Sequence, residues 1–259
     1  MPLVLATVED RIGFITFNHV KKRNVLSTAL VDAVIATLAD FKRQQVRVVI
    51  LRAGPGAQVW SAGHDINEHP ELHRDPLEWD APVRRLIRAI ELHSAPVVAM
   101  IEGSVWGGGC ETAFACDLVV AASNATFAFT PAKIGVPYNI SGMVTFMNAA
   151  NLRSIKEMAF TAQPIDAQRA ERLGMVNHVV ANAELEAFTV NLARQIAANA
   201  PLSIAVMKEE LRLLASANPL PPQEFERIQA LRQAVFESND HHEGILAFRE
   251  KRKPAFNGD

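Results

Sequence analysis

Residues 103–111 read GSVWGGGCE, three glycines in a row with a tryptophan before them and a glutamate two residues after them. The stretch follows an unbroken apolar run, PVVAMIEG (96–103), and stands where a helix is expected to begin. A strand, a glycine turn and a helix start bring backbone N–H groups to one point, where the helix dipole favours negative charge. The glycines therefore predict either close packing of the helix on the strand or a binding site that touches the main chain.

Nucleotide-binding motifs do not explain these glycines. The sequence contains no GxxxxGK(S/T) motif, and GxGxxG does not match at 103–111. A second segment, WSAGHDINE (60–68), also comes directly after an apolar strand and a glycine-rich turn. Two backbone N–H groups that converge from such segments form an oxyanion hole, and glycine suits it because the substrate must contact the backbone.

The alternation of apolar runs and helices extends well beyond the glycines. Unbroken Val- and Ile-rich runs indicate strands that helices cover on both faces, which is typical of an α/β domain. Ser27 can cap a helix whose apolar face includes Leu30 and Leu38. The predicted elements are a hairpin at 3–8 and 11–17, helices near 27–41 and 83–92, and strands at 46–53, 96–103 and 117–123.

From about residue 153 the pattern becomes helical, and prolines interrupt it at Pro164, Pro201 and 219–222. The 259 residues suffice for one large core, or for a main domain with a smaller appendage. We therefore predict an α/β core over residues 1–195 and a C-terminal helical region over residues 196–259.

Composition and charge disfavour several classes of protein. The 26 basic and 28 acidic residues give a net charge of −2, which disfavours nucleic acid as a partner. No apolar run approaches the roughly 20 residues that a membrane span needs, and the N-terminus lacks the features of an export signal. Cys110 and Cys116 lie in apolar segments, as buried thiols in a reducing compartment do. We expect a cytoplasmic protein that binds neither nucleic acid nor membranes.

The paired glycine segments resemble those of the crotonase superfamily, which includes the enoyl-CoA hydratases and isomerases. The resemblance covers essentially the whole chain and rests on SAGHDI (61–66), EGSVWGGGCE (102–111), KKRNVLS (21–27), IGVPYNISG (134–142) and FREKRKPAF (248–256). It implies a crotonase-like α/β spiral of ββα repeats with a C-terminal helical region that trimerises. It also implies an acyl-CoA substrate and a homotrimer or a dimer of trimers, hence a hexamer.

The same resemblance implies roles for individual residues. The backbone N–H groups of His64 and Gly108 would hold the thioester oxygen, and Lys251 would reach the CoA phosphates. Glu111 matches the first of two glutamates with which enoyl-CoA hydratases activate water. The adenine and pantetheine side of the pocket would be lined by Ala62, Gly63, His64, Asp65 and Ile66.

The second hydratase glutamate is absent, because the matching stretch TPAKIG (130–135) has Pro131 in its place. Neither Pro131 nor Thr130 can act as a general base at neutral pH. With Tyr138, the only tyrosine of the chain, these residues are most similar to the branch of the family that decarboxylates methylmalonyl-CoA. The resemblance thus implies conversion of methylmalonyl-CoA to propionyl-CoA and CO₂, through a thioester enolate held in the oxyanion hole and without metal or other cofactor.

Several side-chain roles stay open at this point. Tyr138 either hydrogen-bonds the substrate or belongs to the core, and Thr130 either contacts the acyl group or ends a strand. Glu111 is either a structural acceptor or a proton relay. His64 acts through its backbone alone or also through its imidazole. Asp65 is of the residue type that forms turns.

The nearest alternative function is an enoyl-CoA hydratase or isomerase that uses the single carboxylate of Glu111. A non-catalytic protein that binds acyl-CoA or RNA is a more distant alternative. The nearly neutral net charge argues against binding of RNA. His69 and His73 have the spacing of a metal pair on a helix, but Pro70 between them favours a solvated loop. The sequence therefore predicts no metal site.

Overall fold

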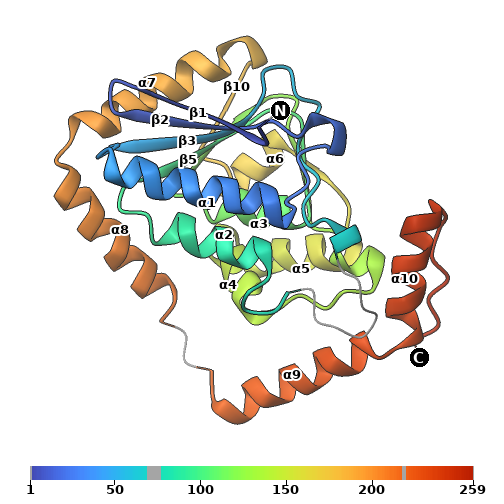
Figure 1. Cartoon of the computed structure of the whole chain (residues 1–259). Coiled ribbons are helices and arrows are strands. Elements are labelled where there is room, and N and C mark those ends of the chain that lie inside the picture. Colours follow the sequence, from blue (N-terminus) through green and yellow to red (C-terminus); the bar gives the residue numbers. More distant parts are fainter. Residues whose placement is uncertain (1, 69–76, 218–219, 259) are drawn as a thin grey trace.

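The computed structural model describes residues 2–68, 77–217 and 220–258 of the chain (Figure 1). Its larger sheet has the strand order β1-β2-β3-β5-β7-β10. The first two strands are the predicted hairpin and pair antiparallel, whereas the other neighbours pair in parallel. The strands of this sheet are β1 (Val4–Glu9), β2 (Ile12–Phe17), β3 (Val48–Ala53), β5 (Val97–Ile101), β7 (Leu118–Ala122) and β10 (His178–Val180).

A second, smaller sheet has the strand order β4-β6-β8-β9. Each of β4, β6 and β8 comes directly after a strand of the larger sheet, and a helix then leads to the next unit. This repetition confirms the predicted spiral of ββα units. The elements are β4 (Val59–Ser61), β6 (Ser104–Trp106), β8 (Thr126–Ala128) and β9 (Ile165–Asp166), with helices α2 (Pro82–Glu91), α3 (Gly108–Phe114) and α4 (Ile140–Ala149).

Helices cover both faces of the larger sheet, which explains the unbroken apolar runs of its parallel strands. Ser27 caps α1 by accepting a hydrogen bond from the backbone N of Leu30 at 3.4 Å, as the sequence predicts. The apolar face of α1 packs into the main core with α2 and the smaller sheet. On the opposite face, α7 buries Leu185 and Ala193 against the sheet. The remaining helices of these layers are α1 (Thr28–Arg43), α5 (Leu152–Thr161), α6 (Ala167–Arg172) and α7 (Leu185–Ala198).

Short 3-10 helices connect several of these elements and carry parts of the candidate site. They are η1 (Val20–Lys22), η2 (Ile66–Glu68), η3 (Pro131–Ile134) and η4 (Asn182–Glu184). No helix in the described parts of the chain combines the length and the apolar character needed to cross a bilayer.

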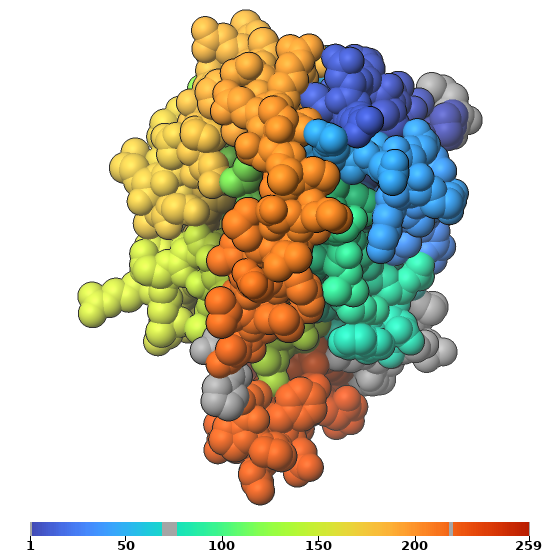
Figure 2. All heavy atoms as spheres, turned by 90° about the vertical axis from the view of Figure 1, so that its left-hand side faces the viewer, coloured from blue at the N-terminus to red at the C-terminus, as the bar shows by residue number. Residues whose placement is uncertain are grey.

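Three C-terminal helices extend along and below the core: α8 (Pro201–Ala215), α9 (Pro222–Phe236) and α10 (Asn239–Glu250) (Figure 1). Figure 2 shows α8, in orange, running across one face of the molecule. The predicted division of the chain after residue 195 falls within α7, which packs on the larger sheet, and it stays a prediction.

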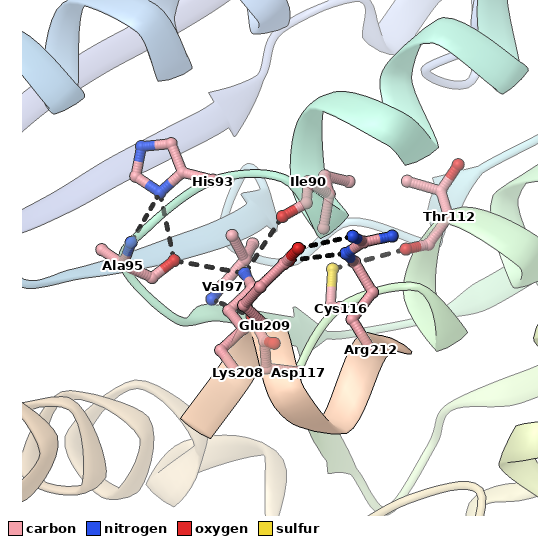
Figure 3. Close-up of polar contacts among 10 residues, drawn as sticks. All are labelled: Ile90, His93, Ala95, Val97, Thr112, Cys116, Asp117, Lys208, Glu209 and Arg212. Atoms are coloured by element: carbon pink, nitrogen blue, oxygen red, sulfur yellow. Dashed lines mark hydrogen bonds and ion pairs between the residues drawn. The ribbon is translucent and has the colours of Figure 1, made fainter. Parts of the chain in front are cut away.

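Lys208 fastens α8 to the core with a side chain that is 9% exposed, although no residue of α8, which is described in full, is completely buried. Lys208 Nζ donates to the carbonyl oxygens of Ile90 at 3.0 Å and Ala95 at 3.3 Å (Figure 3). It also pairs with Asp117 at 2.7 Å, and the same carboxylate oxygen accepts the backbone N–H of Val97. One lysine thus joins the ends of α2, β5 and β7 to α8.

Candidate active site

The loop after β4 is tied to the segment that precedes α1. Ser61 Oγ donates to the carbonyl of Asn24 at 2.8 Å and accepts from Gly63 N at 3.1 Å. The backbone N–H of Leu26 donates to the carbonyl of Gly63 at 2.7 Å. At the far end of the loop, Glu68 accepts from both the backbone N and the hydroxyl of Thr28, at 2.7 and 2.8 Å. These contacts fix both ends of the loop against the residues that precede and begin α1.

This loop and the start of α3 meet backbone to backbone. Gly63 has a φ of +81°, and a β-carbon there would lie 2.5 Å from the carbonyl oxygen of Trp106 and 2.9 Å from Gly108 N. A β-carbon on Gly108 would in turn lie 2.7 Å from Cδ2 of the His64 ring and 3.4 Å from the backbone N of His64. Glycine is therefore required at position 63, any side chain at position 108 would have to displace the His64 ring, and the His64 and Gly108 amides that the family resemblance pairs lie close together.

The backbone N–H of Gly108 lies ahead of the hydrogen-bond ladder of α3. The first bond of that ladder runs from Cys110 N to Gly107 O at 3.0 Å. N–H groups at a helix start have no acceptor within the helix and carry the positive end of its dipole. A ligand oxygen that reached this N–H would meet a donor that has no acceptor within the helix.

Glu111 lies one turn further along α3 and is fully buried, with 0% of its surface exposed. Both of its carboxylate oxygens are engaged. Arg84 Nη1 donates to Oε1 at 2.5 Å, and the hydroxyl of Tyr138 donates to Oε2. Arg84 comes from α2 and is itself 6% exposed, so the ion pair is closed off from solvent.

Burial shifts the titration of both acidic groups in this cluster. Removal from water raises the pKa of Glu111, while the positive charge of Arg84 and the Tyr138 hydrogen bond oppose the rise. Burial, followed by the adjacent charge of Glu111, raises the pKa of Tyr138 well above its usual range, so its hydroxyl keeps its proton at neutral pH. In this structure Glu111 accepts the hydrogen bond that the Tyr138 hydroxyl donates, and a hydrogen bond from Tyr138 to substrate stays a prediction.

Arg84 is the residue that the sequence reasoning missed. It is one of three arginines in the α2 sequence PVRRLIRAIE, and composition does not separate them. A signal was present in the helical spacing, because Arg84 lies three residues before the buried Ile87 and therefore on the core side of the helix. A buried guanidinium needs hydrogen-bond acceptors, and Glu111 is the acceptor that the fold supplies for Arg84.

The segment from Thr130 to Tyr138 forms another side of the site. Thr130 is half-buried, and its Oγ1 would lie 3.5 Å from a β-carbon on Gly107. Pro131 is buried at the start of η3, so no carboxylate enters the site from this position. The ring of Tyr138 packs edge-on against Phe129 at 4.8 Å between centroids.

The other candidate residues fall in different places. Asp65 forms the expected turn, since its Oδ1 accepts the backbone N–H of Asn67 at 3.1 Å. Ala62 and Ile66 are half-buried on the same loop. Lys251 is exposed at the end of α10 with a φ of +56°, and no contact among the described residues joins it to that loop. The predicted roles of these residues toward CoA stay predictions.

No group of histidine, cysteine or acidic side chains in the described part of the chain is arranged to hold a metal ion. His69 and His73, weighed above as a metal pair, lie outside the described residues together with Pro70.

Comparison with known proteins agrees with this geometry. The family model for enoyl-CoA hydratase/isomerase matches residues 7–259. Methylmalonyl-CoA decarboxylase of Escherichia coli strain K12 is 48% identical over 249 residues, which are 96% of this chain and 95% of the relative. A short-chain-enoyl-CoA hydratase of Clostridium acetobutylicum is 28% identical over 96% of this chain and 95% of its own length.

Solved structures give the same picture. A methylmalonyl-CoA decarboxylase in complex with 2-nitronate-propionyl-CoA superposes with a TM-score of 0.98 at 47% identity, covering 99% of both chains. A second complex, with 2S-carboxypropyl CoA, has a TM-score of 0.98 at 46% identity and covers 100% of this chain and 99% of the other.

Proposed function

Because this chain belongs to the enoyl-CoA hydratase/isomerase family, we propose that it is a carboxy-lyase that converts methylmalonyl-CoA to propionyl-CoA and CO₂. The observation that carries the proposal is the identity of 48% to a methylmalonyl-CoA decarboxylase across 96% of the chain. The site supports it independently, since Pro131 stands where a hydratase needs its second carboxylate and the first, Glu111, has both oxygens engaged.

In the proposed reaction the bond between C2 and the departing carboxylate breaks, and its electron pair moves into the thioester to form an enolate. The N–H groups of His64 and Gly108 stabilise the negative charge that develops on the thioester oxygen. The overlap is best when the carboxylate stands perpendicular to the thioester plane, so the site must fix its rotation. A proton taken up at C2 completes propionyl-CoA, and CO₂ leaves.

Arg84 makes this chemistry compatible with a carboxylate in the site. Two like charges at close range repel, and an uncompensated Glu111 would oppose binding of a substrate that carries its own carboxylate. The guanidinium of Arg84 neutralises Glu111 within a buried ion pair. We therefore assign Glu111 the role of holding Tyr138 rather than that of activating water.

Tyr138 and Thr130 are proposed to orient the acyl group. The hydrogen bond to Glu111 fixes the hydroxyl of Tyr138, so the phenol oxygen has one position relative to the substrate. Thr130 stands beside the glycine turn at Gly107. The loop residues Ala62 to Ile66, of which Gly63 and Asp65 are buried, are proposed to receive the adenine and pantetheine portions, and the exposed Lys251 the phosphates.

Assembly and location complete the proposal. Large apolar side chains are exposed on the C-terminal helices, as an interface between subunits requires. We propose a homotrimer or a dimer of trimers in the cytoplasm, where the buried free thiols of Cys110 and Cys116 remain reduced. The exposed side chains on α8 and α9 include Leu202, Val206, Leu211, Leu214, Phe225 and Leu231.

The test is mass spectrometry of the purified chain incubated separately with methylmalonyl-CoA and crotonyl-CoA. We expect propionyl-CoA from the first and no change in the second. Hydration of crotonyl-CoA without decarboxylation would overturn the proposal and make Glu111 the catalyst of a hydratase. Tyr138→Phe should lower kcat/KM by on the order of tenfold to a hundredfold; unchanged kinetics would remove the hydroxyl from the mechanism.

A further inference from the structure

The segment from Thr130 to Tyr138 carries two residues of the proposed site, and the helices that hold it lie about a hundred residues later in the chain. Within the segment, backbone hydrogen bonds run from Lys133 N to Thr130 O, from Gly135 N to Ala132 O and from Val136 N to Pro131 O. Two further carbonyls, those of Gly135 and Pro137, accept hydrogen bonds from side chains of α10 and α9.

His241 provides the first of these contacts. Its ring Nδ1 lies 3.2 Å from the carbonyl oxygen of Gly135. A carbonyl only accepts, so Nδ1 carries the hydrogen in this contact. The imidazole is nearly closed off from solvent, at 5% exposure, and packs edge-on against the ring of Phe236 at 5.3 Å. Because Ser238 caps α10 at His241 N, the backbone that carries the ring is fixed as well.

The helix also touches the main chain of the segment directly. A β-carbon on Gly244 would lie 2.5 Å from the carbonyl carbon and oxygen of Ile134, and one on Gly135 would lie 2.8 Å from the carbonyl oxygen of Asp240. No side chain separates the two backbones here. A displacement of α10 would therefore be passed on to η3 and to the residues that follow it.

Arg232 donates a hydrogen bond to the carbonyl of Pro137, two residues after Gly135. It is 6% exposed on α9, its Nε lies 3.5 Å from Pro137 O, and its guanidinium lies over Phe236. The residue after Pro137 is Tyr138, whose hydroxyl reaches Glu111. The path from α10 to the active-site carboxylate is thus short and made of close contacts.

We propose that His241 is a positioning residue for the active site. By holding the carbonyl of Gly135 it sets the course of the main chain from η3 to Tyr138, and so the place of the Tyr138 hydroxyl on Glu111. The effect of His241 on turnover rests on the proposed decarboxylation, whereas its effect on the position of Tyr138 does not. The C-terminal helices would then shape the site of their own chain, in addition to any part they take in assembly.

The single tyrosine of the chain allows a direct test. Protein that carries 3-fluorotyrosine has one ¹⁹F resonance, which reports on the surroundings of Tyr138. His241→Phe keeps the buried ring against Phe236 and removes the donor. His241→Asn supplies an amide N–H close to the place of Nδ1. His242→Phe changes an exposed residue of the same helix and is the matched control.

We expect His241→Phe to shift the resonance and to lower kcat by on the order of tenfold, with KM within about threefold of the unchanged protein. His241→Asn should restore both readouts, and His242→Phe should change neither. An unshifted resonance in His241→Phe, or no recovery in His241→Asn, overturns the proposal. Should His241→Phe fail to fold by circular dichroism, His241→Leu is judged by the same criteria. If the unchanged chain does not decarboxylate methylmalonyl-CoA, the proposed function fails, and the resonance still decides the role of His241.

Discussion

Replacing Arg84 by methionine removes the counter-charge of a carboxyl group that has no access to water. Glu111 is 0% exposed, Arg84 is 6% exposed, and their nearest atoms are 2.5 Å apart. A buried carboxylate that loses its partner takes up a proton rather than staying charged. Arg84→Met should therefore fold with Glu111 protonated at neutral pH and be less stable than the unchanged chain.

The size of the loss follows from that proton. Holding Glu111 protonated at pH 7, about 2.5 pH units above the range where glutamate ordinarily titrates, costs at most about 3.4 kcal/mol of folding free energy. Burial already raises the pKa of Glu111 in the unchanged chain, so the difference between the two proteins lies below that limit. A group whose pKa is raised by folding contributes stability at acid pH and loses it as pH rises through that pKa. The difference should therefore shrink below about 1 kcal/mol near pH 5.

Denaturant unfolding followed by the fluorescence of the three tryptophans, at pH 5 and pH 7, measures this difference. Arg85→Met is the matched control, because Arg85 pairs with Asp32 on the surface, with side chains 34% and 50% exposed. It should cost less than about 1 kcal/mol at either pH. Adding Glu111→Gln to Arg84→Met should recover part of the loss at pH 7. Equal losses for the two arginine variants, or a loss that does not depend on pH, would refute the assignment of Arg84 as the counter-charge.

Three further predictions follow from single contacts. Gly108→Ala places a β-carbon 2.7 Å from the His64 ring and should lower kcat by at least about tenfold in a decarboxylation assay; near-normal turnover would argue against the oxyanion hole. Burial raises the pKa of Glu91, so the contribution of this group to stability is lost as pH rises. The Tm of Glu91→Gln minus the Tm of the unchanged chain should therefore be larger at pH 8 than at pH 5. A gain of the same size at both pH values would contradict this. Lys208→Met removes the charged partner of Asp117 and a donor to two carbonyls, and should cost about 2 kcal/mol, or roughly 4–8 °C in Tm, by calorimetry; an unchanged Tm would show that α8 is held by other contacts.

Much of the fold can be predicted from the sequence because the larger sheet is buried on both faces. Burial forces unbroken apolar runs, and every predicted strand and helix is present with ends shifted by one or two residues. The smaller sheet could not be predicted from the residues alone. Its strands β4, β6 and β8 have three residues each, too few for any period to show, and it became expected only through the family resemblance.

The site divides in the same way. The glycines of 60–68 and 103–111 could suggest in advance that two backbone segments meet, but the choice of the His64 and Gly108 amides came from the family resemblance. The state of Glu111 could not, because it depends on Arg84, 27 residues earlier, and on Tyr138, 27 residues later. A glutamate at position 111, taken without its neighbours, would be interpreted as the catalytic base of a hydratase. Its partners change what it can do: one oxygen accepts a hydrogen bond from a guanidinium and the other from a phenol, and the positive charge of Arg84 offsets the repulsion of a substrate carboxylate. The same glutamate can thus serve opposite chemistries, and the buried cation beside it decides which of them the site permits.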